Sequence, residues 1–146
     1  METIGEIGDV CGQVILGGYL GETPTTTMLK RLELGHVAGV ILFKRNIPSA
    51  EAAYDSCGIV AHAAKYPPFI SIDQEGGRVG RLVAPVLKLP PMSQVGRIGD
   101  TQLAYRLGKE LGKQLGALGF NVDFAPVLDV NTNPNNPVIG DRSFGD

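Results

Sequence analysis

Short apolar runs that do not alternate with polar residues recur along this chain, and a pattern typical of a helix separates each from the next. The clearest runs are GVILF at 39–43 and FISID at 69–73. A strand that is apolar on both faces must be covered on both faces, as happens in parallel sheets with helical crossovers. Two further runs, 13–19 and 121–130, predict two more strands, the second of which ends or bulges at Pro126.

Two helices are expected before the third strand. Pro24 and the threonines after it favour a helix start, and Gly35 is a suitable end. Ser49 is a good N-cap for a second helix, which reaches to about Lys65. Each helix therefore fills the interval between two apolar runs.

A third helix is expected, capped by Asp100 or Thr101 and ended by Gly119. Its apolar stripe consists of leucines at helical spacing: Leu103, Leu107, Leu111, Leu115 and Leu118. The proline-rich segment 76–99 before this helix, and the sequence after residue 130, are predicted to be loops.

This alternation predicts an α/β fold with parallel strands. Four β/α units are about the first half of a (β/α)8 TIM-type barrel, and the sequence stops within a loop. We therefore expect residues 1–146 to be the N-terminal part of a partial barrel whose C-terminal half is absent. Polar side chains gather after the predicted strands, which is where ligands bind in open α/β sheets and in barrels.

Composition excludes several classes of protein. The chain is 43% hydrophobic, which is typical of a globular protein with a hydrophobic core. Its net charge of −2 gives no indication of a nucleic-acid partner. Its apolar stretches are all shorter than the ~20 residues that a membrane span needs. The N-terminal METIGEIGDV has neither a basic segment nor a long apolar one, so a cytoplasmic location is expected.

The cysteines and histidines form no metal-binding motif. Cys11 and Cys57 are far apart and typical of reduced thiols. His36 and His62 have no His, Cys or carboxylate nearby at metal-ligand spacing. We expect neither a metal site nor an organic cofactor.

The carboxylates Asp73 and Glu75 follow the third predicted strand and allow three interpretations. Residues i and i+2 of an extended segment point the same way, as a catalytic pair could require. The two glycines at 76–77 make the chain leave that geometry. A ligand-binding carboxylate at a strand end, or an ion pair with Arg78 or Arg81, accounts for the pattern as well.

Arg81 and Arg142 arrive on the loops after the third and fourth strands. A guanidinium can donate two parallel hydrogen bonds to a hydroxyl-rich or carboxylate ligand. Surface salt bridges are the alternative for both. The loop 129–136 is either a turn-rich connection or a substrate-facing segment that positions Arg142.

Four stretches in this order carry a family resemblance: GVILFKRN, ISIDQEGGRVGRL, LGFNVDFAPVLDVNTN and IGDRSFGD. They resemble the N-terminal domain of family 3 glycoside hydrolases, and DQEGGRV with a second arginine is similar to the bacterial β-N-acetylhexosaminidase branch. The resemblance implies a TIM-type barrel and hydrolysis of terminal β-linked N-acetylhexosamine with retention. It also implies a role in trimming cell-wall muropeptides during recycling.

The resemblance assigns substrate binding to Asp73, Arg81 and Arg142, which would hold hydroxyl groups of a small saccharide, an N-acetylglucosaminide. It assigns no catalytic role to any residue of this chain, and neither Glu75 nor Asp123 is carried over as catalytic. No cofactor or metal is implied.

The chain lacks the reacting groups of the family. Members continue with a stretch resembling KHFPGHG, then a loop with an Asp–His acid/base pair, and later an aspartate nucleophile, and none of these occurs here. A double displacement needs both groups. We therefore expect this chain to be inactive alone. The alternative is a non-catalytic half-barrel that binds carbohydrate and self-associates, or pairs with a second half, through its open edges.

Overall fold

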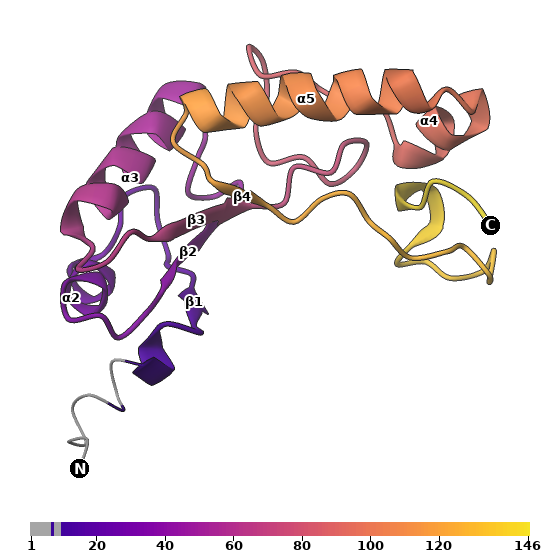
Figure 1. The fold of residues 1–146 in the computed structure, drawn as a ribbon. Helices are drawn as coiled ribbons and strands as arrows, with labels where there is room; N and C mark the ends of the chain where they lie inside the picture. The colour runs from indigo at the N-terminus through magenta and orange to yellow at the C-terminus, as the bar shows by residue number, and fades with distance from the viewer. Residues whose placement is uncertain (1–6, 8–9) are drawn as a thin grey trace.

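The computed structural model describes residue 7 and residues 10–146 of the chain (Figure 1). The absence of a secretory signal was inferred mainly from residues 1–6 and 8–9, which lie outside the described residues. In chain order the elements are β1 Leu16–Gly17, α2 Thr26–Glu33, β2 Gly39–Leu42, α3 Ala50–Ala63, β3 Phe69–Ile72, α4 Met92–Ile98, α5 Thr101–Ala117, β4 Val122–Asp123 and the 3-10 helix η1 Gly140–Arg142.

The strands form one parallel sheet in the order β1-β2-β3-β4. In the register, Val40 pairs with Ile70, and Ile72 pairs with Asp123. Sequential parallel strands joined by right-handed crossovers carry their helices on one face of the sheet. The predicted α/β fold with parallel strands is confirmed, in the arrangement of successive units of a (β/α)8 barrel.

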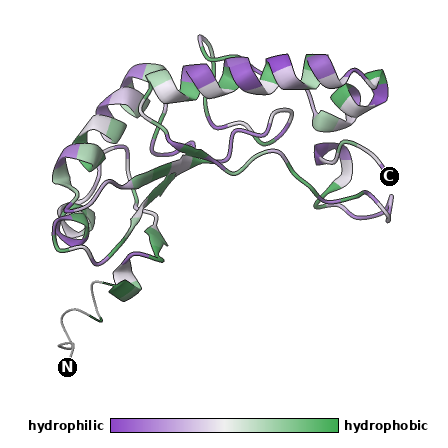
Figure 2. Ribbon diagram, viewed as in Figure 1, coloured by the Kyte–Doolittle hydropathy of each residue, from purple (hydrophilic) through white to green (hydrophobic). Residues whose placement is uncertain are grey.

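The core lies between the sheet and its helices. Val40, Leu42 and Ile72 are fully buried in the sheet, and Leu32 of α2 and Val60 of α3 are buried against them. Figure 2 shows hydrophobic colouring on the strands and a mixture of hydrophobic and hydrophilic colouring along the helices. Among the described residues, the structure contains no helix that is both long and apolar enough to cross a membrane.

The predicted helix boundaries are confirmed by their caps. The side chains of Thr25, Ser49 and Asp100 accept hydrogen bonds from the first-turn amides of α2, α3 and α5. Gly35 and Gly119 follow α2 and α5 with positive φ angles of 75° and 95°, which favour glycine.

Two predicted strands are much shorter than their apolar runs. The run 13–19 contributes only β1, and Val14 and Ile15 before it are exposed in a turn. The run 121–130 contributes only β4. The strand β4 is limited by its neighbour, because β3 ends at Ile72 and offers no further residues for pairing.

The prediction of a continuous loop over 76–99 is wrong, because α4 lies within it. Two prolines precede this helix, and Met92 and Val95 turn into the core. Its seven residues are too few to show a helical period. Gly96 lets α4 approach the backbone of Phe144, where a Cβ atom would overlap the Phe144 carbonyl. The C-terminal segment thus packs beside α4 (Figure 1).

Candidate functional site

Charged side chains collect at the carboxyl ends of β3 and β4. Asp73 follows β3 directly, Glu75 comes two residues later, and Asp123 is the last residue of β4. Because the strands are parallel and adjacent, these ends lie at the same edge of the sheet. This edge is where the sequence predicts ligand contacts.

Asp73 and Arg81 form an ion pair, with Arg81 Nη2 donating to Asp73 Oδ2 over 2.7 Å. Their side chains are 22% and 25% exposed, so solvent reaches both. The Gln74 side chain brings Arg81 back to Asp73, because its Oε1 accepts from the amides of Arg81 (2.7 Å) and Leu82 (3.0 Å). Gln74 is buried and the sequence analysis missed it; its place between two acids at a strand end was the available signal.

The glycine pair makes the predicted departure from extended geometry. Gly76 and Gly77 have φ angles of 110° and 54°, and Gly76 exchanges backbone hydrogen bonds with Val79. A Cβ atom at Gly76 would collide with the Pro90 carbonyl. Because the chain turns here, the two carboxylates do not share a partner, and each pairs with a different arginine.

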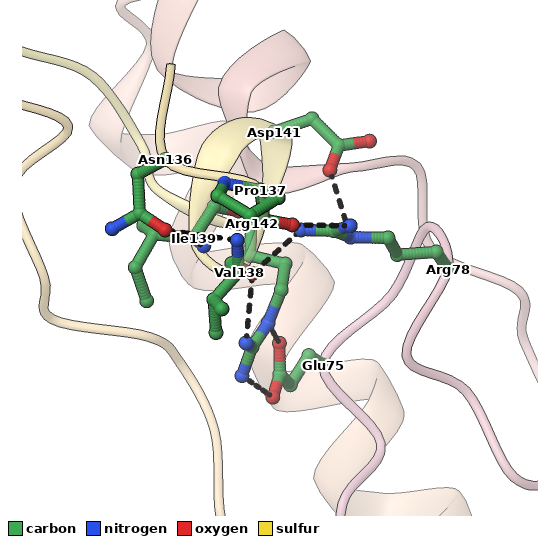
Figure 3. Close-up of polar contacts among 8 residues, drawn as sticks. All are labelled: Glu75, Arg78, Asn136, Pro137, Val138, Ile139, Asp141 and Arg142. Carbon is green, nitrogen blue, oxygen red and sulfur yellow. Dashed lines mark hydrogen bonds and ion pairs between the residues drawn. The ribbon is translucent and has the colours of Figure 1, made fainter. Parts of the chain in front are cut away.

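Glu75 pairs with Arg142, which belongs to η1. Arg142 Nε and Nη2 donate to the two carboxylate oxygens of Glu75, each over 2.8 Å (Figure 3). Glu75 is nearly buried, with 6% of its side chain exposed, and Arg142 is 23% exposed. These hydrogen bonds to Glu75 are the main cause that raises the pKa of Arg142 above its ordinary value. The structure therefore brings Arg142 to Glu75, whereas Arg81 lies on Asp73.

The loop after β2 also reaches this edge. The guanidinium of Arg45 lies 4.7 Å from the centroid of the Phe43 ring, and that of Arg81 lies 5.7 Å from it. Such cation–π contacts are worth about 0.5–1 kcal/mol where solvent is near. The ring helps to fix Arg81. Arg81 Nε is buried and has no hydrogen-bond partner among the described residues.

Asp123 is a buried carboxyl group in the same cluster. Burial raises its pKa, the Gln74 amide opposes this by donating to Asp123 Oδ1 over 2.9 Å, and the charges of Asp73 and Glu75 add to the increase. Asp123 thus anchors the backbone at Gln74. Residue 7 and residues 10–146 contain no cluster of three or more His, Cys, Asp or Glu that could hold a metal ion.

A cavity of about 370 Å³ lies next to this cluster, beneath α5. Apolar side chains such as Leu107 and Leu111 form most of its wall, and Glu75 and Asp123 reach it from the strand ends. None of the predicted sugar ligands, Asp73, Arg81 and Arg142, lines this cavity. Of the four residues that form the two ion pairs, only Glu75 also lines this cavity.

The model of the glycosyl hydrolase family 3 N-terminal domain matches residues 3–146. The chain belongs to glycosyl hydrolase family 3. Similar family 3 relatives include a beta-hexosaminidase of Nitrosomonas eutropha, 41% identical over 129 residues, covering 82% of this chain and 36% of the relative. A beta-hexosaminidase A of Pseudoalteromonas piscicida is 37% identical over 128 residues, covering 82% of this chain and 21% of the relative. The chain thus spans about a third or less of these two relatives.

Solved family 3 structures share the fold. A glycoside hydrolase family 3 beta-N-acetylglucosaminidase from a Paenibacillus species superposes with a TM-score of 0.86 at 38% identity, covering 99% of this chain and 28% of that one. NagZ from Neisseria gonorrhoeae, in complex with N-trifluoroacetyl-D-glucosamine, superposes with a TM-score of 0.82 at 30% identity, covering 90% and 40%. The predicted family and the partial TIM-type barrel are confirmed.

Proposed function

We propose that this chain forms part of the sugar-binding subsite of a β-N-acetylhexosaminidase, with Asp73, Arg81 and Arg142 holding the terminal N-acetylglucosamine. The observation that carries the proposal is the pair of arginine–carboxylate contacts at the carboxyl ends of β3 and β4. The beta-hexosaminidase relatives and the family 3 structure with a glucosamine derivative support the choice of sugar.

The Asp73–Arg81 pair retains capacity for a ligand. Asp73 Oδ2 accepts from Arg81, whereas Asp73 Oδ1 accepts no hydrogen bond from any residue that the structure describes. A carboxylate oxygen accepts hydrogen bonds from sugar hydroxyls, and the neighbouring guanidinium fixes the orientation of that carboxylate. Asp73 would therefore accept from the sugar while Arg81 holds its orientation.

In the complete gene product, we propose that these contacts act during retaining hydrolysis of terminal β-linked N-acetylhexosamine. Contacts to hydroxyl groups that strengthen as the ring distorts lower the barrier through differential binding. The nucleophile and the acid/base would lie outside these 146 residues. We further propose that the substrate comes from cell-wall muropeptides and that the protein works in the cytoplasm.

The test is a turnover assay of the complete gene product with chromogenic N-acetyl-β-glucosaminide and β-glucoside. We expect the N-acetylated substrate to be preferred, and residues 1–146 alone to be inactive. Asp73→Asn should raise KM for the N-acetylglucosaminide about tenfold, a loss of about 1.4 kcal/mol. Asp55→Asn, on the exposed surface of α3, is the matched control.

Four results would contradict this proposal. A preference for the β-glucoside would reject the sugar, and an unchanged KM in Asp73→Asn would reject the role of Asp73. Turnover by residues 1–146 at the rate of an intact relative would reject the location of the reacting groups. Saccharide binding by the complete gene product without any turnover would favour a carbohydrate-binding half-barrel instead.

A further inference from the structure

Arg142 is carried by a loop that is folded largely on itself. We call residues 136–142 the Arg142 loop. Asn136 Oδ1 accepts from the amides of Val138 (2.9 Å) and Ile139 (3.4 Å), and the Arg142 amide donates to the Ile139 carbonyl over 3.0 Å. These local bonds satisfy the N–H groups of Val138, Ile139 and Arg142.

One side chain from a distant segment donates hydrogen bonds to backbone carbonyls of this loop. Arg78, on the turn after β3, donates from Nη1 to the Pro137 carbonyl over 3.1 Å. Its Nη2 donates to the carbonyls of Val138 (2.6 Å) and Ile139 (3.1 Å), and its Nε lies 3.2 Å from Asp141 Oδ1. Figure 3 shows Arg78 reaching the loop from the side opposite Asn136.

The exposed ion pair alone would not fix the loop. Arg78 and Asp141 have side chains that are 47% and 48% exposed, and such pairs contribute about 0–1 kcal/mol. The hydrogen bonds from one planar guanidinium to three consecutive carbonyls restrain the loop more strongly, because they fix the backbone from Pro137 to Ile139 in one conformation. A lysine has no such fork of donors.

The Val138 carbonyl joins the two arginines. It accepts from Arg78 Nη2 over 2.6 Å and from Arg142 Nη1 over 3.1 Å. Two guanidinium groups on one oxygen repel each other, and Asp141 and Glu75 supply one negative charge to each. Arg142 is therefore held from both sides, by Glu75 through its charge and by Arg78 through the shared carbonyl.

Arg142 retains N–H groups that can bind a ligand. A guanidinium has five N–H groups. Arg142 uses Nε–H and one Nη2–H on Glu75, and one Nη1–H on the Val138 carbonyl. Among the described residues nothing else accepts from it, so one N–H on each terminal nitrogen remains available to two oxygens of a ligand.

We propose that Arg78 and Glu75 are positioning residues that hold Arg142 with its two remaining N–H groups directed at the sugar. The inference rests on the proposed function, in which Arg142 binds the saccharide. Arg78 itself makes no contact with the sugar and acts through the Arg142 loop. Any change that frees the loop should weaken binding without removing a sugar ligand.

The experiment compares Arg78→Ala, Arg78→Lys and Arg142→Ala in the complete gene product, with Arg106→Ala as the matched control. Arg106 is an arginine of α5 with 65% of its side chain exposed, and its nearest carboxylate lies 3.9 Å away. The first readout is the dissociation constant for N-acetylglucosamine. The second is the NMR resonance of the Arg142 Nε–H with the hydrogen exchange of the Val138 and Ile139 amides, which needs no sugar.

We expect Arg142→Ala and Arg78→Ala each to weaken N-acetylglucosamine binding about tenfold, and Arg78→Lys by nearly as much. In both Arg78 variants the Arg142 Nε–H resonance should shift and the two amides should exchange faster. Arg106→Ala should leave all of these unchanged. Asp141→Asn, which keeps the three carbonyl bonds, should give a smaller effect and serves if Arg78→Ala does not fold.

The outcomes separate the two proposals. If Arg142→Ala weakens binding and Arg78→Ala behaves like Arg106→Ala, the positioning role is wrong and the proposed subsite stands. If Arg78→Lys retains full binding with an unshifted resonance, the positioning role is also wrong. If Arg142→Ala binds the sugar like the control, Arg142 is no sugar ligand, and the inference fails together with that part of the proposed function.

Discussion

Arg142 and Glu75 are 67 positions apart, and their side chains meet in a bidentate ion pair with two contacts of 2.8 Å. The pair fastens the C-terminal segment to the end of β3. Because Glu75 is almost fully buried, its carboxylate would destabilise the folded protein without a cationic partner. The contact therefore serves stability and site geometry together.

A double-mutant cycle on this pair should show strong coupling. Arg142→Gln leaves the Glu75 carboxylate buried without its cation, so the free energy of unfolding should fall by about 3 kcal/mol. The variant with both Glu75→Gln and Arg142→Gln should recover part of that loss, because no uncompensated charge remains. Urea unfolding of the two single variants and the double variant measures the coupling. Strictly additive losses would show that the two side chains do not depend on each other.

Asp123→Asn should stabilise the protein at neutral pH. Burial raises the pKa of Asp123, so folding favours its protonated form. The stability from this group is fully present below the ordinary pKa of 3.8 and is lost as the pH rises through the folded value. Asparagine keeps an oxygen for the Gln74 amide and cannot ionise. Unfolding at pH 7 and at about pH 3 measures the gain, which should be present only at the higher pH.

The same glycine-to-alanine change should have opposite effects in two helices. Gly116 of α5 has open space around it, so Gly116→Ala should raise the free energy of unfolding by roughly 0.5–1 kcal/mol. In Gly96→Ala of α4 the new methyl group would overlap the Phe144 carbonyl, and a loss of about 1–3 kcal/mol is expected. Chemical unfolding of both variants gives the comparison. A stabilising Gly96→Ala would mean that the C-terminal segment does not pack on α4.

Cys57 should make the protein less stable in alkali. Burial raises the pKa of its thiol from the ordinary 9.0 to about 12. The unfolded chain then loses this proton at a lower pH than the folded one, so stability is complete below pH 9.0 and falls between there and about 12. The slope from this thiol approaches 1.4 kcal/mol per pH unit. Cys57→Ala should lack it in unfolding measured across this range, whereas Cys11→Ala, at an exposed position, should keep it.

Sequence patterns predicted most of the fold because each rests on local physics. The apolar runs at 39–43 and 69–73 became β2 and β3, since side chains apolar on both faces need cover from helices. Helix ends followed the capping residues, as at Ser49. The helix α4 was missed because its seven residues are too few to show a helical period.

The sequence by itself determined the family and the residue types available at the strand ends. It left open whether Asp73 and Glu75 form a catalytic pair, bind a ligand or pair with an arginine. Only the tertiary structure decided which arginine meets which acid, with Arg81 on Asp73 and Arg142 on Glu75. The reason is physical: an ion pair forms where the chain path brings two side chains within about 4 Å, and that path depends on every turn between them.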